Sequence, residues 1–582
     1  MPRDGKDHAL VVIAGGVGLT GVLWAAGAVS ARLAGHRVPT GRPFGGLAAL
    51  DHFADPSAAW HAPVGPAVLY WAVTVCLLAL TGTVIWGAWR LFRGPGNSGR
   101  SDPERVEGLA LAAEVSRFAG ERVLLARGGL LRPSLERPRA AQVGYRLGVA
   151  RGVECWASVE DSMLLVGPPR SGKGRNLVVP MILDAPGAVV TTSTRPDNLT
   201  LTLDARAKDR PVAVFDPEGL ARAPGVVPAM RWSVLRGCES PQVAMRRAGV
   251  LVAGSGGSGV ENGQFWRERT VTAVRCLLHA AALGERAPGD LYRWSHAPAR
   301  AKEAVAILSG SASAAPGWDS ALDAIIGSDP RTRDSVWAMV ANTFSALADP
   351  AVLEAVSPEG TNGFDPVGFL RERGSLYLLG TSAEATGTAN LVAAFVEDVV
   401  HTARRLAAGS PAARLDPPLA LVLDEAANYA LPSLPGLMSD GGGSGITTVA
   451  VLQSLAQARL RWGRDAAGAI WDAAIVKVVL GGSANADDLV DISRLLGERQ
   501  VREETQTLTE RGRTVSSSVR SRPILEPADL RRLGAGHALL LLRSAPPIVM
   551  SLRPWTARPD AGELEEARAG FEAAMQGSAE PL

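Results

Sequence analysis

A loop with the residues needed to bind phosphate lies near the end of the first third of the chain. Gly167-Pro-Pro-Arg-Ser-Gly-Lys-Gly174 matches the pattern G-x-x-x-x-G-K-[ST] at every position except the last. An apolar run, 163–166, precedes this loop and a helix-like stretch, 175–183, follows it. Glycines let the backbone curl so that its N–H groups point inward, and the next helix adds its positive end. We therefore expect Lys173 to reach the β- and γ-phosphates of a nucleotide. The predicted nucleotide-binding residues are Gly167, Pro168, Pro169, Arg170, Ser171, Gly172, Lys173, Gly174 and Arg175.

Two adjacent carboxylates form the second candidate feature. Asp424 and Glu425 end the apolar run 419–423. A buried strand would deliver Asp424 to the edge of the sheet where Mg²⁺ sits against nucleotide phosphates. Glu425 is then placed to orient or activate the attacking water. A strand that ends in a solvated acidic turn is the alternative. Together with the upstream loop, the pair indicates Mg²⁺-dependent hydrolysis of ATP, with Asp424 as the metal ligand and Lys173 and Glu425 as catalytic residues.

Gln453 ends the next apolar run, 447–452, and is the third candidate catalytic residue. By analogy with glutamines that position water in other nucleotide hydrolases, its amide is expected to sense the γ-phosphate and relay hydrolysis to the neighbouring helix. An ordinary glutamine at a strand end is the alternative interpretation.

The composition fits a large folded chain and sets few other limits. Its 582 residues are enough for several domains, and 47% of them are hydrophobic. A net charge of +2 neither requires nor excludes nucleic acid, because a groove or pore can be basic locally. The four cysteines are scattered without C-x-x-C spacing, so neither a zinc site nor a disulfide framework is expected.

The order of strand-like and helix-like segments indicates an α/β fold. Apolar runs at 187–192 and 211–217 follow the loop, and four more lie between 375 and 481. Strands that alternate with helices predict a mostly parallel, doubly wound sheet. The segment 241–355 has only helix-like patterns, and we expect it to be an all-α insertion. The remaining expected divisions are a linker and helix at 93–140, the two parts of the sheet domain at 141–240 and 356–555, and an acidic tail at 556–582.

Two long apolar runs, 9–30 and 67–89, open the chain. Each has about the 20 residues that cross a bilayer core. Arg90 and Arg93 follow the second run, which is typical of a cytoplasmic flank. We expect residues 1–92 to be a membrane anchor of two transmembrane helices, with the nucleotide-binding part on the cytoplasmic side. A cleaved signal peptide plus one span is the rival, and a pair of buried core helices is the alternative to both.

Taken in order, these features resemble the type IV secretion coupling proteins of bacterial conjugation, the membrane-anchored ATPases of the TraG/TraD kind. The matching stretches are the two apolar runs, GPPRSGKG, the all-α insertion and four short motifs, one before the insertion and three after it. Those motifs are VFDP at 214–217, LVLDEAAN at 421–428, VLQSLAQ at 451–457 and the block 481–497, which begins Gly-Gly-Ser and ends Leu-Gly. The resemblance implies a hexameric RecA-like motor in the inner (plasma) membrane. Such a motor recruits a relaxase–DNA complex and uses ATP and Mg²⁺ to feed single-stranded DNA to a type IV secretion channel.

Two departures qualify the resemblance. Gly174 replaces the usual Ser or Thr, but GKG also occurs in this family. Without that hydroxyl, Mg²⁺ would be coordinated by Asp424, phosphate oxygens and water. Many family members also carry an arginine between the acidic pair and the glutamine, proposed to act on the neighbouring subunit's nucleotide. This chain has Gly442 and Ser444 there. Either an arginine shortly downstream serves instead, or hydrolysis is slow. The downstream arginines are Arg459, Arg461 and Arg464.

The polar, Arg-rich stretch 497–520 lacks aromatic residues, so we expect a solvated loop there rather than the lining of a DNA pore. Two rival functions remain open at this point. One is a double-stranded DNA translocase of the FtsK/HerA kind, although no winged-helix module is evident. The other is a nucleotide-gated membrane scaffold that hydrolyses little ATP, which the residues at 174, 442 and 444 favour.

Overall fold

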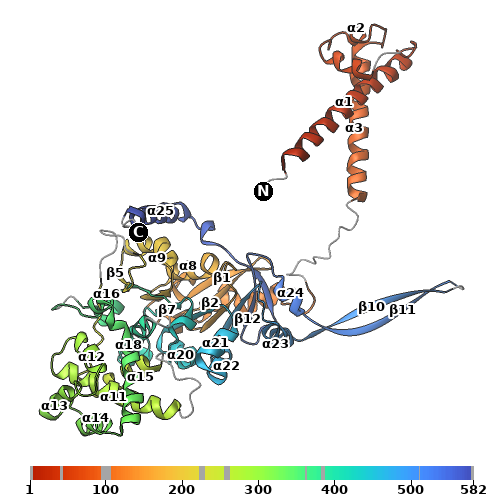
Figure 1. The fold of residues 1–582 in the computed structure, drawn as a ribbon. Coiled ribbons are helices and arrows are strands. Elements are labelled where there is room, and N and C mark those ends of the chain that lie inside the picture. The colour runs from red at the N-terminus through yellow and green to blue at the C-terminus, as the bar shows by residue number, and fades with distance from the viewer. Residues whose placement is uncertain are drawn as a thin grey trace. The chain divides into compact units, whose positions relative to one another are not determined.

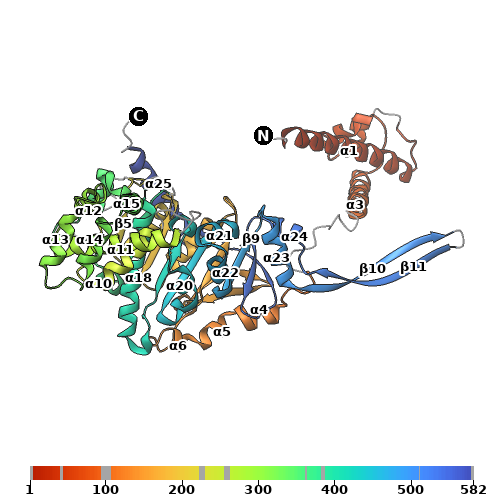
Figure 2. The ribbon, with the colours of Figure 1, turned by 60° about the horizontal axis from the view of Figure 1, so that its bottom comes forward.

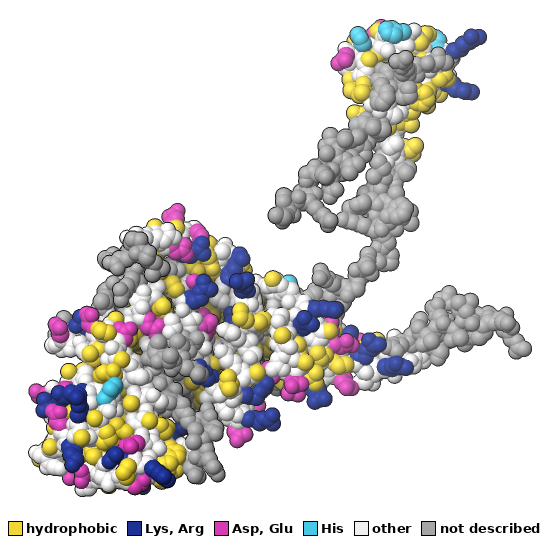
Figure 3. Space-filling model, in the orientation of Figure 1, with side chains coloured by type: hydrophobic (Ala, Val, Ile, Leu, Met, Phe, Trp, Pro, Cys, Tyr) yellow, Lys and Arg dark blue, Asp and Glu magenta, His cyan; other side chains and the backbone are white. Residues whose placement is uncertain are grey.

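The computed structural model describes residues 4–39, 43–92, 106–221, 230–253, 263–360, 363–381, 387–509 and 512–577. The chain forms two compact units, Met1–Ser101 and Asp102–Leu582 (Figure 1). On the face shown in Figure 3, basic and acidic side chains of the larger unit are interspersed, in keeping with the small net charge.

The smaller unit is helical. It contains α1 (Asp4–Leu33), the 3-10 helix η1 (Pro43–Leu50), α2 (Pro56–Trp60) and α3 (Ala67–Phe92). Tyr70 of α3 is fully buried, and its hydroxyl donates to the carbonyl of Leu23 on α1 at 3.2 Å. The Ser30 hydroxyl donates to the carbonyl of Val64 at 2.7 Å. The first contact joins the two long helices, and the second joins α1 to the segment between them.

The prediction of a two-span membrane anchor, and with it the multi-pass location in the cell membrane, is wrong. Over the residues that the structure describes, none of the helices combines the length and the apolarity that crossing a bilayer demands. Apolar side chains of α1 and α3 instead contribute to a core inside the unit, where Ala26 and Tyr70 pack with Trp60.

An eleven-stranded sheet organises the larger unit, in the order β2-β1-β13-β12-β9-β3-β8-β7-β4-β6-β5. Neighbours among the last seven of these strands pair in parallel, whereas β12 pairs antiparallel with β9 and β13, and β1 with β13 and β2. The prediction of an α/β fold with a large, mostly parallel sheet is confirmed. The parallel strands are β3 (Met163–Val166), β4 (Val189–Ser193), β5 (Val212–Phe215), β6 (Ser375–Leu379), β7 (Leu419–Leu423), β8 (Ile446–Leu452) and β9 (Val476–Leu480). The antiparallel strands are β1 (Gly144–Ala150), β2 (Val153–Ser158), β12 (His537–Leu542) and β13 (Ile548–Ser551).

Both faces of the sheet are covered, because alternate residues of its strands enter different hydrophobic clusters. Leu164 and Leu421 pack with residues of α18 (Thr388–Ala408). Leu165 and Val422 pack with residues that follow the phosphate loop, including Ile182 of α8 (Val179–Asp184). Burial on both faces explains why these strands read as continuous apolar runs in the sequence. Figures 1 and 2 show helices on the two sides of the sheet.

Among its described residues in the range 241–355, the segment between β5 and β6 consists of helices and the turns that join them, and α10 packs on α18 of the sheet domain. Its helices are α10 (Pro241–Ala253), α11 (Gly263–Leu283), α12 (Pro288–Ser295), α13 (Lys302–Gly310), α14 (Trp318–Ile326), α15 (Pro330–Thr343) and α16 (Pro350–Ala355). Trp294 of α12 is fully buried, and its indole N–H donates a hydrogen bond to the Glu303 carboxylate at 3.0 Å. The finer domain bounds expected from the sequence stay predictions.

A long two-stranded ribbon replaces the solvated loop expected at 497–520. Strand β10 (Glu498–Thr509) pairs antiparallel with β11 (Gly512–Pro523) along their whole length, from Glu498 opposite Pro523 to Thr509 opposite Gly512. The ribbon extends away from the eleven-stranded sheet (Figures 1 and 2). Its Thr and Val residues favour strands, but they lack the apolar alternation of a half-buried strand, so the sequence pattern suggested a loop.

Candidate nucleotide-binding site

The phosphate loop begins where β3 ends, beside the end of β8. The Gly167 N–H donates to the carbonyl of Leu452 at 3.1 Å, which fixes the first residue of the loop against the neighbouring strand. Arg170 and Gly172 have φ values of 62° and 88°, so the backbone turns twice through the left-handed region. Such turns bring successive N–H groups to one side, as an anion-binding loop requires. A π-helical turn, Gly174–Val178, and then α8 follow.

Lys173 lies over this loop. Its amine donates to the carbonyl of Gly167 and, at 3.5 Å, to that of Pro168. Burial lowers the pKa of Lys173, while the nearby charges of Asp424 and Glu425 raise it. The lysine and the two carboxylates, which are about 250 residues apart in the sequence, are therefore close enough to interact electrostatically in the fold.

Asp424 follows β7 at the same edge of the sheet. One carboxylate oxygen accepts from the Asn198 amide at 3.2 Å, and the other accepts from the Glu425 N–H at 3.0 Å. The Asp424 carbonyl also accepts from the Thr192 hydroxyl at 2.9 Å. Burial raises the pKa of Asp424, and the hydrogen bond from Asn198 and the charge of Lys173 oppose that rise. A buried carboxylate with this pKa gains from a nearby cation.

Glu425 has a constrained backbone and a fixed side chain. Its φ of 51° is left-handed, which costs a residue other than glycine about 1 kcal/mol or more. Its carboxylate accepts from the Thr194 hydroxyl and, at 3.0 Å, from the Asn428 amide on α19 (Ala426–Tyr429). Strained, well-anchored residues of this kind cluster at functional sites.

Gln453 follows β8, which lies between β3 and β7 in the sheet. Val166 pairs with Leu452, so Gln453 starts its loop directly beside Gly167. Its N–H donates to the Gln457 side chain at 3.3 Å, and Ser454 caps α21 (Leu455–Trp462) by accepting from the Gln457 N–H at 3.2 Å. The carboxyl ends of three adjacent parallel strands thus place Lys173, Asp424, Glu425 and Gln453 at one edge.

Sequence reasoning missed three side chains that hold the acidic pair. Asn198 bonds Asp424, while Thr194 and Asn428 bond Glu425. Thr194 and Asn198 follow β4, the strand next to β7. Polar residues directly after a buried strand were the available clue, because loops after parallel strands meet at one edge. The partners of Thr194 and Asn198 lie far along the chain, so no local pattern identified those two, whereas Asn428 lies three residues from Glu425.

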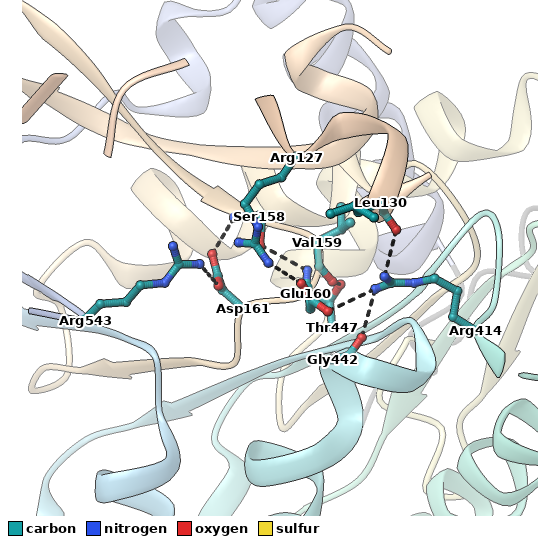
Figure 4. Close-up of polar contacts among 10 residues, drawn as sticks. All are labelled: Arg127, Leu130, Ser158, Val159, Glu160, Asp161, Arg414, Gly442, Thr447 and Arg543. Carbon is teal, nitrogen blue, oxygen red and sulfur yellow. Dashed lines mark hydrogen bonds and ion pairs between the residues drawn. The ribbon is translucent and has the colours of Figure 1, made fainter. Parts of the chain in front are cut away.

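The segment expected to carry an arginine is packed against the main chain of another loop (Figure 4). A Cβ added to Gly442, in the 3-10 turn η6 (Gly441–Ser444), would stand 2.0 Å from the carbonyl oxygen of Glu160. The Gly442 carbonyl accepts from Arg414 at 3.1 Å, and Arg414 also pairs with Glu160 at 3.5 Å. Arg127 pairs with the same Glu160 carboxylate. This contact leaves no room for a side chain at position 442.

We predict that Gly442→Ala destabilises the folded protein by about 2 kcal/mol or more, because the added methyl group overpacks the contact with Glu160. Chemical denaturation followed by circular dichroism measures the change in the free energy of unfolding. Gly443→Ala is the matched control, since nothing lies within 4 Å of a Cβ there. We expect the control to change stability by no more than about 0.5 kcal/mol. Equal stability of the two variants would contradict this role for Gly442.

Two family models match the chain. One, described as "Type IV secretory system Conjugative DNA transfer", matches residues 123–225 and includes the phosphate loop. The other, described as "TraM recognition site of TraD and TraG", matches residues 418–535 and includes Asp424, Glu425 and Gln453. No curated protein matches the chain significantly.

Solved structures of the plasmid coupling protein TrwB have a similar fold. An unbound form is 20% identical, with a TM-score of 0.54, and the match covers 73% of this chain and 91% of that one. The TrwB complex with ADP and Mg²⁺ is 19% identical, with a TM-score of 0.51 over 73% of this chain and 91% of that one. The complex with the non-hydrolysable ATP analogue ADPNP is 20% identical, with a TM-score of 0.52 over 73% and 92%.

Proposed function

Because the chain resembles the type IV secretion coupling proteins in two family models and in fold, we propose that it hydrolyses ATP to drive conjugative DNA transfer. In this proposal it couples a relaxase bound to single-stranded DNA to a type IV secretion channel. One observation carries the enzymatic part. The fold places the ends of β3 and β7 at one edge of the sheet, so Lys173 of the phosphate loop lies near the partly buried pair Asp424 and Glu425.

The residues at this edge fit a nucleotide with Mg²⁺. A solved structure of TrwB is a complex with ADP and Mg²⁺. The Ser171 hydroxyl in the loop is buried and has no hydrogen-bond partner among the described residues, so a ligand there gains a donor. Asp424 is the carboxylate that would hold Mg²⁺. The metal would supply positive charge to the phosphate oxygens as the bond to the leaving phosphate breaks.

The remaining chemistry belongs to three side chains of this chain. Lys173 binds the β- and γ-phosphates and offsets charge that develops on them. Glu425 accepts a proton from the attacking water, with its carboxylate held by Thr194 and Asn428. Gln453 senses the γ-phosphate and passes the change to α21, whose first turn is capped by Ser454. A carboxylate fixed in advance orients the water without a cost at the moment of reaction.

We extend the proposal to a homo-hexamer, the assembly that the family resemblance implies. In a ring, an arginine of one subunit can reach the nucleotide of the next. Of the three downstream arginines, Arg459 is engaged by Asp488 at 2.7 Å, whereas Arg464 is exposed at the start of α22 (Arg464–Ala473). Arg464 is therefore the best candidate for that role. The family model over 418–535 is named after TraM recognition, which supports a relaxosome partner for this half of the chain.

A scaffold that binds ATP but hydrolyses little is the second candidate function. The observation in its favour is the contact at Gly442, where the usual arginine is sterically excluded. A double-stranded DNA translocase is the rival within the motor class.

ATPase assays on the full chain separate these functions. We predict that single-stranded DNA raises the rate of phosphate release by at least about tenfold, a change of about 1.4 kcal/mol in the barrier. Double-stranded DNA of the same length is expected to have a smaller effect. Stimulation only by double-stranded DNA would favour the translocase. Nucleotide binding with no turnover in the presence of either DNA would favour the scaffold.

A further inference from the structure

A cavity of about 430 Å³ lies between α10 of the helical insertion and α18 of the sheet domain. Pro432 and Ser433, which follow the helix that carries Asn428, form another part of its wall. A second cavity of about 280 Å³ adjoins it, because both are lined by Val243 and Asp398. The larger volume falls within the range of about 300–1,000 Å³ that small-molecule sites occupy.

Arginines dominate the polar lining of these two cavities. They are Arg246, Arg247 and Arg404 in the larger one and Arg236 and Arg405 in the smaller one. Three of the five have carboxylate partners: Arg247 pairs with Asp398 at 2.8 Å, Arg404 with Asp440 at 2.7 Å and Arg236 with Asp365 at 3.1 Å. Within the described part of the chain, Arg246 and Arg405 have no carboxylate within ion-pair distance.

The carboxylates that line the cavities offset these two arginines only in part: Asp398 and Glu397 raise the pKa of Arg246, but its net shift is downward. Asp398 is already engaged by Arg247 and by the Trp232 indole N–H at 3.1 Å. Glu397 accepts from the Ser433 N–H at 3.3 Å, and burial raises its pKa. Positive charge therefore remains in excess at the cavities.

The pKa shifts of two groups at the cavities agree with an excess of positive charge. Burial, followed by the charges of Arg246 and Arg405, lowers the pKa of His401. Burial and then Arg247 lower the pKa of Arg246, and the charges of Asp398 and Glu397 oppose that shift. An anion placed among these groups would relieve their mutual repulsion. The Ser433 hydroxyl is also buried; it lies beside the Glu397 carboxyl, whose pKa it lowers, and it can turn to donate to a ligand.

We propose that the adjoining cavities bind the phosphate groups of a small anionic ligand, with Arg246 and Arg405 as its charged contacts and the Ser433 hydroxyl as a neutral donor. Arginine is well suited to this ligand because its planar guanidinium can donate two parallel hydrogen bonds to a phosphate. The site lies apart from the phosphate loop and shares none of its residues.

This ligand would act on a segment that joins two of the predicted catalytic residues. Glu425 is held by Asn428, and the chain then passes through Leu431 to Ser433. The Trp462 indole N–H, at the end of the helix that follows Gln453, donates to the Leu431 carbonyl at 2.8 Å. A ligand in the cavity would therefore contact the segment that lies between Glu425 and Gln453 in the sequence. The binding itself does not depend on the proposed hydrolysis.

The test uses the full chain with Lys173→Ala, which disables the phosphate loop, and inorganic pyrophosphate as the probe. We expect calorimetry to detect binding and hydrogen–deuterium exchange to show slower exchange in α10 and around Ser433. Adding Arg246→Gln and Arg405→Gln should weaken the binding by at least about tenfold, because two charge-assisted contacts are lost. Arg331→Gln removes an equal charge from an exposed position on α15 and should leave the affinity unchanged.

Three results would overturn the proposal. Pyrophosphate could fail to bind the Lys173→Ala chain, or bind it with the same affinity after Arg246→Gln and Arg405→Gln. Alternatively, a single-stranded oligonucleotide but not pyrophosphate could protect the same amides, which would assign the cavity to a nucleic-acid backbone. Circular dichroism of each variant checks that it is folded, so that a loss of affinity is not caused by unfolding.

Discussion

Glu425→Gln is expected to lower kcat for ATP hydrolysis by about 10²–10⁴-fold, the range attributed to a general base. Glutamine keeps the size of the side chain and an oxygen that accepts from Thr194 and Asn428, but it cannot take the proton of the attacking water. Nucleotide affinity should therefore stay close to that of the unaltered chain. Steady-state phosphate release measures kcat, and fluorescent-nucleotide titration measures the affinity.

Glu372→Gln provides the control for this substitution, because Glu372 is exposed and lies outside the site. It removes the same charge and should leave kcat unchanged. A kcat for Glu425→Gln within about threefold of the unaltered chain, less than 1 kcal/mol in the barrier, would show that Glu425 is not the base.

Lys173→Ala is expected to abolish productive nucleotide binding, with a loss of about 10²-fold or more in kcat/KM. The amine lies over the loop carbonyls of Gly167 and Pro168 and is partly buried, so its charge acts on phosphates with little screening by water. Removing one preorganised donor that stabilises a developing negative charge lowers kcat by about 10²–10³-fold in other enzymes. Unlike Glu425→Gln, this change should weaken nucleotide affinity as well as turnover.

Lys302→Ala is the matched control, since Lys302 is an exposed lysine at the start of α13 in the helical insertion. It should bind and hydrolyse ATP as the unaltered chain does. Equal nucleotide affinity in Lys173→Ala and Lys302→Ala would remove the phosphate loop from the proposed site.

The sheet and its functional edge could be predicted because local sequence determines them. Runs such as 419–423 are buried on both faces, so continuous apolar residues marked the strands, and polar residues at their ends marked one edge. The parallel pairing of β3, β7 and β8 then brings the three motifs together. The roles of Lys173, Asp424, Glu425 and Gln453 in that arrangement remain proposals.

Features that depend on contacts between distant segments could not be predicted. Gly442 is required by the approach of the Glu160 carbonyl, and the acidic pair is held by Asn198 and Thr194 from another loop. The ribbon of β10 and β11 lacks the apolar alternation that indicates a strand. The first apolar runs had the length of membrane spans, but length and composition do not reveal that Tyr70 and Ala26 pack within the smaller unit.

If the protein moves along single-stranded DNA, it should displace a protein bound to the end of that DNA. The full chain is loaded on single-stranded DNA that carries biotin-bound streptavidin at one end, and the release of streptavidin is measured. We expect release with ATP and Mg²⁺, and none with ADPNP or with Glu425→Gln. No release under conditions in which ATP is hydrolysed, or equal release with ADPNP, would contradict ATP-driven movement along DNA.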